Sequence, residues 1–245
     1  MIVIPMAGMS RRFTEAGYAL PKYMLPLAGR SVFDHAVGSF QAYFDDLPFL
    51  FIARDVAGTQ AFLERSCDAL GIRDAAIVML DEPTAGQAET VEMGLHRAGT
   101  GDGEALTIFN IDTFRPGFRF PAQPWSTASD GYLEVFRGAG ANWSYVRPSP
   151  DEPGLALETA EKRPISDLCC TGLYHFSRAG DFRQALAAER ANPAAAELYV
   201  APIYNHLIAA GRRIHYEVID ASEIIFCGVP AEYEALLAAS GNAAG

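Results

Sequence analysis

Several features that mark membrane and secreted proteins are missing from this sequence of 245 residues. No apolar run approaches the length of a bilayer-spanning helix, and the opening MIVIP is too short, and lacks the charged flank, for a signal peptide. The cysteines form neither a CxxC pair nor a secreted disulfide framework; they are Cys67, Cys169, Cys170 and Cys227. We therefore expect a cytoplasmic protein with reduced thiols.

Histidines and basic residues are also scarce. The five histidines lie without the short spacing of a zinc site. The chain has 19 basic against 30 acidic residues and a net charge of −11, which argues against nucleic acid or an anionic membrane as the main partner. The first thirty residues are the exception, because Arg11, Arg12, Lys22 and Arg30 face only Glu15 there. An anionic ligand would therefore be bound locally, near the start of the chain.

The order of apolar runs predicts one compact α/β domain with an appended lobe. In the first two-thirds, apolar runs alternate with amphipathic segments, which is typical of strands connected through helices into a mainly parallel sheet. The expected strands span residues 1–7, 48–54, 75–80 and 105–112, with helices over 31–44, up to Leu70, and over 87–98. From about residue 115, short strand-like pieces indicate a smaller β-rich lobe; helices over about 178–190 and 202–211, a strand over 213–220 and a helix over 230–239 follow.

The helix after the first loop has a recognisable start. Ser31, with Asp34 three residues on, makes a capping-box-like N-terminus. Aromatic and aliphatic residues then recur at helical spacing, at Phe33, Val37, Phe40 and Phe44. The pattern predicts one helix with a buried aromatic face.

Polar or glycine residues follow the first and fourth expected strands, at the edge where open α/β sheets bind ligands. Gly8 and Ser10 are small enough for backbone N–H groups to approach an anion, and Arg12 and Lys22 would complete a phosphate cradle. A solvated basic loop is the alternative interpretation. Asp112 suits Mg²⁺, which takes one or two carboxylates plus substrate phosphates, but a turn or helix-cap aspartate is equally consistent with its position.

Six segments together resemble the sugar-1-phosphate nucleotidyltransferases, the family of glucose-1-phosphate thymidylyl- and uridylyltransferases. They are PMAGMSRRF, PKYMLPLAG, PTAGQAETV, FNID, EKRPISDLCCTGLYHF and FCGVPAEYEALL, and their order extends the resemblance over nearly the whole chain. The resemblance implies an α/β fold, a Rossmann-like three-layer sandwich with a mostly parallel mixed sheet and a smaller β-rich substrate lobe. Residues 1–114 would form a nucleotide-binding half and residues 115–245 a sugar-phosphate-binding half of a single domain.

The resemblance also implies roles for individual residues. Nucleotide binding would fall to Met6, Ala7, Gly8, Ser10, Arg12, Lys22, Asp81 and Gly86. Substrate binding would fall to Asp112, Glu161, Lys162, Thr171, Gly172 and Tyr174, although Glu161 and Lys162 taken alone could be a surface ion pair. Catalysis would rest on Arg12, Lys22, Asp112 and Lys162, with Mg²⁺ as cofactor held by Asp112 and Glu223.

Three positions depart from the family pattern. Ser10 stands where a glycine is common, and Asp81 stands where many relatives have a glutamine. A carboxylate could accept hydrogen bonds from uracil or thymine N3–H or from the cytosine amino group, so the base stays open. Phe226 stands where the family often has a second metal-binding aspartate. Either Asp220 or Glu223 compensates, or one carboxylate suffices, or activity is reduced.

The expected reaction is attack of a sugar-phosphate oxygen on the α-phosphorus of a nucleoside triphosphate, with release of pyrophosphate. The attacking phosphate is already ionised, so the site must supply positioning and charge neutralisation rather than a base. The product would serve capsule or other surface polysaccharide synthesis. Alternatives are a cytidylyltransferase for a small non-sugar phosphate and a catalytically weak nucleotide-binding protein. A homo-oligomer is possible; nucleic acid and membrane are not expected partners.

Overall fold

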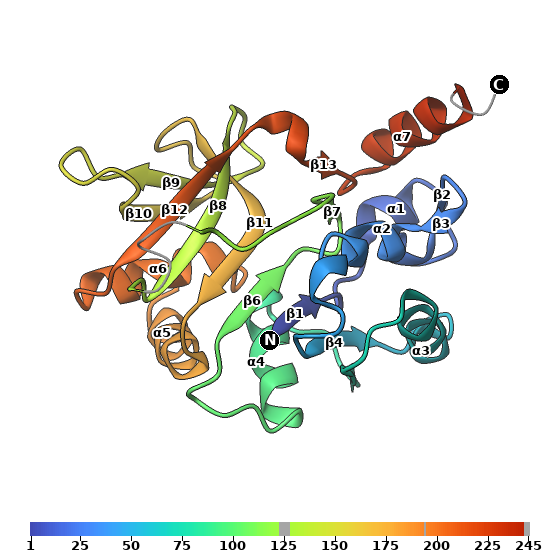
Figure 1. Cartoon of the computed structure of the whole chain (residues 1–245), viewed down its shortest axis with the longest axis horizontal. Coiled ribbons are helices and arrows are strands. Elements are labelled where there is room, and N and C mark those ends of the chain that lie inside the picture. Colours follow the sequence, from blue (N-terminus) through green and yellow to red (C-terminus); the bar gives the residue numbers. More distant parts are fainter. Residues whose placement is uncertain (123–127, 194, 243–245) are drawn as a thin grey trace.

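A computed structural model of the chain describes residues 1–122, 128–193 and 195–242. Figure 1 shows a central sheet with helices packed on its two faces. The main sheet has nine strands in the order β10-β9-β11-β6-β1-β4-β5, with β8 beside β11 and β12 beside β8. The mixed α/β fold expected from the sequence is confirmed. Within the described ranges, no helix has both the length and the apolar character needed to cross a bilayer.

The main sheet has a parallel part and a largely antiparallel part. The parallel strands are β6 (Leu106–Phe109), β1 (Ile2–Pro5), β4 (Phe49–Arg54) and β5 (Ala75–Leu80). The remaining strands are β8 (Gly131–Arg137), β9 (Ser144–Pro148), β10 (Ala156–Glu161), β11 (Leu168–Phe176) and β12 (Ile214–Ile219). β11 joins the two parts because it pairs antiparallel with β6, β8 and β9.

Helices and two small sheets complete the fold. The helices are α1 (Arg11–Glu15), α2 (Val32–Gly38), α3 (Thr59–Leu70), α4 (Gln87–Arg97), α5 (Ala179–Ala191), α6 (Val200–Ala209) and α7 (Pro230–Asn242). Short 3-10 turns are η1 (Lys22–Met24), η2 (Gln41–Tyr43) and η4 (Ala221–Glu223). The small sheets pair β2 (Pro26–Leu27) with β3 (Arg30–Ser31), and β7 (Thr113–Phe114) with β13 (Ile225–Phe226).

The buried strands have an apolar core on each face. In β1, Ile2 and Ile4 pack with α2 and α3, whereas Val3 faces α4, α5 and α6. β4 alternates in the same way, with Phe51 on the first face and Ile52 on the second. Successive strand residues point to opposite faces, so these continuous apolar runs belong to strands covered on both sides.

The helix after the first loop is shorter than its sequence pattern predicts. The capping box is confirmed: the Ser31 hydroxyl accepts from the Asp34 N–H at 3.0 Å, and the Asp34 carboxylate accepts from the Ser31 N–H at 2.9 Å. α2 ends at Gly38, and Phe40 and Phe44 flank η2 beyond it. Both phenylalanines are buried in the core, as the pattern predicts. They reach it from the ends of the separate turn η2 rather than from one continuous helix.

The last helix returns to the first half of the chain. Tyr233 of α7 packs against Phe13 and Tyr18, with ring centroids 6.2 Å and 5.6 Å away, and its hydroxyl donates to the Pro26 carbonyl at 2.7 Å. Figure 1 shows α7 beside α1 and β2, away from β8 to β12. α7 therefore accompanies the predicted nucleotide-binding half, although its sequence lies in the other.

Candidate active site

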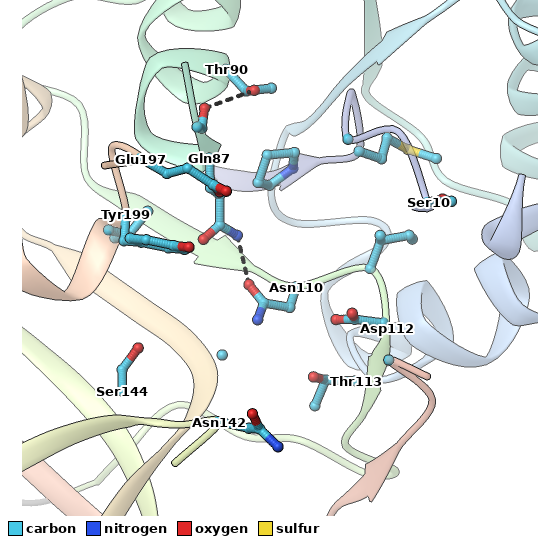
Figure 2. A pocket seen from close by; sticks show the side chains of 18 of the residues that line it. Ser10, Gln87, Thr90, Asn110, Asp112, Thr113, Asn142, Ser144, Glu197 and Tyr199 are labelled. Carbon is cyan, nitrogen blue, oxygen red and sulfur yellow. Dashed lines mark hydrogen bonds between the residues drawn. The ribbon is translucent and has the colours of Figure 1, made fainter. Parts of the chain in front are cut away.

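A cleft of about 930 Å³ opens at the carboxyl ends of β1 and β6. β4 and β5 follow β1 on one side, while β6 lies on its other side, so the strand order reverses between β1 and β6. Open α/β sheets bind ligands at such a reversal, because the two following loops diverge there. Figure 2 shows side chains from several elements converging on this space.

The loop after β1 forms one wall of the cleft. Met6 and Ala7 are buried beneath it, and Ser10 adopts a left-handed backbone with φ of 49° at the start of α1. This conformation disfavours residues with a Cβ, so a glycine would adopt it at lower cost than Ser10 does. Among the described residues, none hydrogen-bonds or ion-pairs with the Arg12 guanidinium. Arg12 therefore offers its donors to the cleft.

An ion pair crosses the cleft floor between two loops. The Nζ atom of Lys22, in η1, lies 2.5 Å from Oδ2 of Asp112, which follows β6. Both side chains are largely covered, at 18% and 25% exposure. The carbonyl of Asp112 also accepts from the Cys227 N–H at 2.8 Å, so β13 is fixed against the same loop. Burial raises the pKa of the Cys227 thiol to about 12, which keeps it uncharged.

Gly86 allows two distant segments to touch. A Cβ added there would lie 2.5 Å from the Leu198 carbonyl oxygen and 2.6 Å from its nitrogen, and φ of Gly86 is 154°. Leu198 in turn donates to the Ala85 carbonyl at 3.0 Å and accepts from the Ala88 N–H at 2.9 Å. This contact brings Glu197 and Tyr199 to the rim of the cleft, as Figure 2 shows.

Two amides meet in the middle of the cleft. Nε2 of Gln87, at the start of α4, donates to Oδ1 of Asn110, at the end of β6, over 2.6 Å (Figure 2). A Cβ on Gly172, whose φ is +99°, would lie 2.5 Å from Nδ2 of Asn110. A side chain at position 172 would therefore clash with the Asn110 amide, and glycine avoids this clash.

A buried carboxylate and a lysine lie at the end of β10. The Glu161 carboxylate accepts from the Ser144 hydroxyl, and burial raises its pKa. Nζ of Lys162 lies 3.8 Å from Oε1 of Glu161 and donates to the Tyr199 hydroxyl at 2.5 Å, which is the main cause that raises the lysine's pKa. Lys162 holds a left-handed φ of 55°, so its backbone is strained at this point.

A buried ionic network supports the neighbouring wall. The Thr171 hydroxyl donates to Glu134 at 3.1 Å, and Glu134 pairs with Arg115 at 3.1 Å. Desolvation raises the pKa of Glu134, and the charge of Arg115 partly offsets that shift. The network ties Thr171, on β11, to the segment that follows β7.

Most sequence-predicted site residues lie together in this cleft. Those that line it are Met6, Ala7, Gly8, Ser10, Arg12, Lys22, Gly86, Asp112, Glu161, Thr171, Gly172 and Tyr174. Lys162 reaches its rim through Tyr199.

Besides Lys162, two predicted residues, Asp81 and Glu223, are not among the residues that line the cleft, and an arginine pairs with each of their carboxylates. Asp81 pairs with Arg97 at 2.8 Å and is 83% exposed, and Glu223 pairs with Arg115 at 3.1 Å. Asp220 caps η4 instead, accepting from the Ser222 N–H at 2.8 Å. The structure therefore provides no link between these carboxylates and the nucleotide or metal roles expected for them.

A carboxylate that sequence reasoning missed lies beside Asp112. Oε2 of Glu232, in the first turn of α7, accepts from the N–H groups of Gly228 at 2.7 Å and Val229 at 3.2 Å. A Cβ added to Gly228 would lie 3.1 Å from Oδ2 of Asp112 and 3.7 Å from Oε2 of Glu232. The two carboxylates therefore approach Gly228 together. The only sequence signal is a glutamate in a first helical turn, which more often serves as a cap.

Comparison with known proteins points to one kind of enzyme. No protein-family model and no curated protein matches the chain. A crystal structure of a nucleoside-diphosphate-sugar pyrophosphorylase from Vibrio cholerae RC9 is 51% identical, with a TM-score of 0.92, over 97% of this chain and 100% of that one.

More distant structures share the fold. A putative glucose-1-phosphate thymidylyltransferase from Bacillus anthracis is 16% identical, with a TM-score of 0.74, over 98% of this chain and 94% of that one. An inositol-1-phosphate CTP transferase from T. maritima is 12% identical, with a TM-score of 0.72, over 98% and 95%. At these identities the likeness concerns the fold alone.

Proposed function

Since the chain belongs to the nucleoside-diphosphate-sugar pyrophosphorylase family of sugar-1-phosphate nucleotidyltransferases, we propose that it transfers a nucleoside monophosphate from a nucleoside triphosphate to a sugar 1-phosphate. Pyrophosphate is the second product. One observation carries the proposal: a single cleft at the strand-order reversal gathers Arg12, Lys22 and Asp112 on one side and Glu161 on the other. The product would supply capsule or other surface polysaccharide synthesis.

The triphosphate would lie along the loop after β1. The Arg12 guanidinium, which pairs with no other described residue, presents a planar fork that suits phosphate oxygens. Lys22 would exchange its contact with Asp112 for a phosphate, because both side chains line the cleft and stay partly exposed to it. The base would be read by the turn over residues 83–86 rather than by Asp81, since that turn lines the cleft.

The acceptor phosphate would lie between the triphosphate and Lys162. Its oxygen attacks the α-phosphorus in line, and the bond to the pyrophosphate oxygen breaks. The attacking phosphate is ionised at neutral pH, so no side chain has to remove a proton. Arg12, Lys22 and Lys162 hold the two anions together and stabilise the charge that develops between them.

The donor set on the cleft floor fits Mg²⁺. Within the described ranges no three histidines, cysteines or acidic residues cluster as a protein-only metal cage. Asp112 and Glu232 offer two carboxylates flanking Gly228, and Mg²⁺ is typically held by one or two carboxylates together with substrate phosphates. Bound there, the ion would neutralise charge on the triphosphate. Glu232 thus takes the role expected of Glu223, whose carboxylate pairs with Arg115.

Pyrophosphate release tests the proposal. The purified protein is incubated with Mg²⁺, each of the four nucleoside triphosphates, and either a panel of sugar 1-phosphates or phosphocholine as a small non-sugar phosphate. We expect release only with a sugar 1-phosphate and one preferred base. Release with phosphocholine and CTP alone would favour the cytidylyltransferase alternative. Triphosphate binding without any release would indicate a nucleotide-binding protein.

A further inference from the structure

Two aromatic side chains form one wall of the cleft. Trp143 and Phe226 are half-buried and line it, with ring centroids 4.6 Å apart and an interplanar angle of 52°. Phe136 lies behind them, 5.2 Å from Trp143 and 5.3 Å from Phe226, and is itself buried. This third ring packs on the side away from the cleft and is not among the cleft-lining residues.

The wall lies between the predicted acceptor residues and the carboxylate floor. On one side, the Trp143 carbonyl accepts from the Lys162 N–H at 2.9 Å, and the next residue, Ser144, bonds Glu161. On the other side, Phe226 pairs with Thr113 across β13 and β7. Thr113 follows Asp112 in the chain, and Cys227, which follows Phe226, donates to the Asp112 carbonyl. A molecule held by Lys162 and directed at Asp112 would pass along these two rings.

Phe226 changes the chemistry of its position. A phenyl ring cannot ligate a metal ion and carries no charge, unlike the aspartate expected at this position. It packs on Trp143 instead. The exposed parts of the two rings are apolar surface in a cleft whose other nearby groups, Ser144, Glu161 and Asn142, are polar. Covering that surface with an apolar partner is favourable.

We propose that Trp143 and Phe226 determine acceptor specificity by packing against an apolar C–H face of the acceptor's organic part. This inference rests on the proposed nucleotidyl transfer. The polar residues near the wall would bind the hydrogen-bonding edge of the same group. A sugar-ring face and a methylated alkyl group share the required chemistry, and the test separates them.

The kinetic test uses the acceptor that supports turnover. We expect Trp143→Ala and Phe226→Ala each to raise the KM for the acceptor about tenfold, with a smaller change in kcat and none in the KM for the triphosphate. Phe226→Leu keeps an apolar contact and should restore most of the acceptor affinity. Phe136→Leu is the matched control, since it perturbs the same cluster away from the cleft; it should lower the Tm while leaving the acceptor KM unchanged.

A binding test separates this inference from the proposed function. Trp125→Phe leaves Trp143 as the single tryptophan of the chain, so indole fluorescence reports on the wall. Glucose 1-phosphate and phosphocholine are the two probes, titrated with a non-hydrolysable triphosphate present. We expect one of them to shift the emission of Trp143, and Phe226→Ala to weaken that probe's binding. Unchanged emission at saturating acceptor, or an unchanged acceptor KM in both alanine variants, would overturn the inference. Absence of pyrophosphate release with every acceptor would instead refute the proposed function.

Discussion

Gly228 lies between two carboxylates that come from distant parts of the chain. Asp112 follows β6, whereas Glu232 lies in the first turn of α7, where it also caps the N–H groups of Gly228 and Val229. A glutamine at position 232 would keep an oxygen for those N–H groups but lose the negative charge. The capping and metal-binding roles of Glu232 can therefore be separated by one substitution.

We expect Glu232→Gln to weaken binding of Mn²⁺, used in place of Mg²⁺, by at least about tenfold, the loss that even an outer partner of a metal ligand causes. Isothermal titration calorimetry in the presence of the triphosphate measures it. Glu223→Gln is the matched control, because Glu223 pairs with Arg115 and is not among the residues that line the cleft. Equal Mn²⁺ affinity in wild type and Glu232→Gln would remove Glu232 from the site.

Local sequence predicted the cations of the cleft better than its carboxylates. Arg12 lies in α1 and Lys22 in η1, the first two elements after β1, so their position follows from the strand that precedes them. The carboxylates at 81 and 223 are held by arginines 16 and 108 residues away in sequence. Such pairings form only in the folded chain, and no local sequence pattern predicts them.

At the level of elements, the loop before α4 and the turn before α6 form a bridge across the cleft. Their backbones exchange hydrogen bonds at Ala85, Ala88 and Leu198, and Gly86 lies at the closest approach. The bridge carries Tyr199, which in turn holds Lys162. The position of Lys162 thus depends on a contact between two segments about 110 residues apart.

Replacing Gly86 with alanine should separate this bridge. The added Cβ would overlap backbone atoms of Leu198, which cannot rotate away as a side chain could, so we expect a loss of about 1–3 kcal/mol in the free energy of unfolding. Gly101→Ala is the matched control: nothing lies within 4 Å of its added Cβ, and its stability should stay within about 0.5 kcal/mol of wild type. Urea denaturation measures both. Similar stabilities for the two variants would contradict the close packing described for Gly86.

Element boundaries show where sequence patterns stop being informative. The predicted helix over residues 31–44 has the right cap, but Ser39 instead accepts a hydrogen bond from the Arg115 N–H at 2.8 Å, and the helix ends at Gly38. The glycine at this point weakens the helix, and the hydrogen bond between Ser39 and Arg115 then fixes where the helix ends. α6 similarly begins at Val200, two residues before the proline expected to start it.

At the level of the whole molecule, the buried histidine of β11 couples stability to pH. His175, on β11, contacts the Thr107 hydroxyl through Nδ1 at 3.0 Å and stacks on Tyr132, with centroids 4.8 Å apart. Burial lowers its pKa from 6.5 to about 4. Between these two values the unfolded chain binds a proton that the folded chain does not. Stability is therefore lost as pH falls through that window.

From pH 7 to pH 5 the wild type should lose about 2 kcal/mol in the free energy of unfolding through His175 alone. His175→Gln removes this group, so its stability should fall by correspondingly less over the same range. Urea denaturation at the two pH values gives the comparison, and His215 cancels because both proteins retain it. Parallel losses in the two proteins would show that His175 does not titrate in this window.

The overall architecture could be predicted because alternating strands and helices leave few alternatives to a parallel sheet. The return of α7 to the first half could not, because it depends on packing of Tyr233 against Phe13 and Tyr18. That return delivers Glu232 to Asp112. The part of the site that sequence reasoning missed thus follows directly from the part of the fold that it missed.

The most direct measurement of the central claim follows the phosphorus atoms. The protein is incubated with Mg²⁺, the preferred acceptor, and a nucleoside triphosphate labelled at either the α- or the γ-phosphate. Nucleotidyl transfer predicts that the α-label appears in the nucleotide-linked acceptor and the γ-label in pyrophosphate. A γ-label on the acceptor, or an α-label only in free nucleotide, would contradict the account.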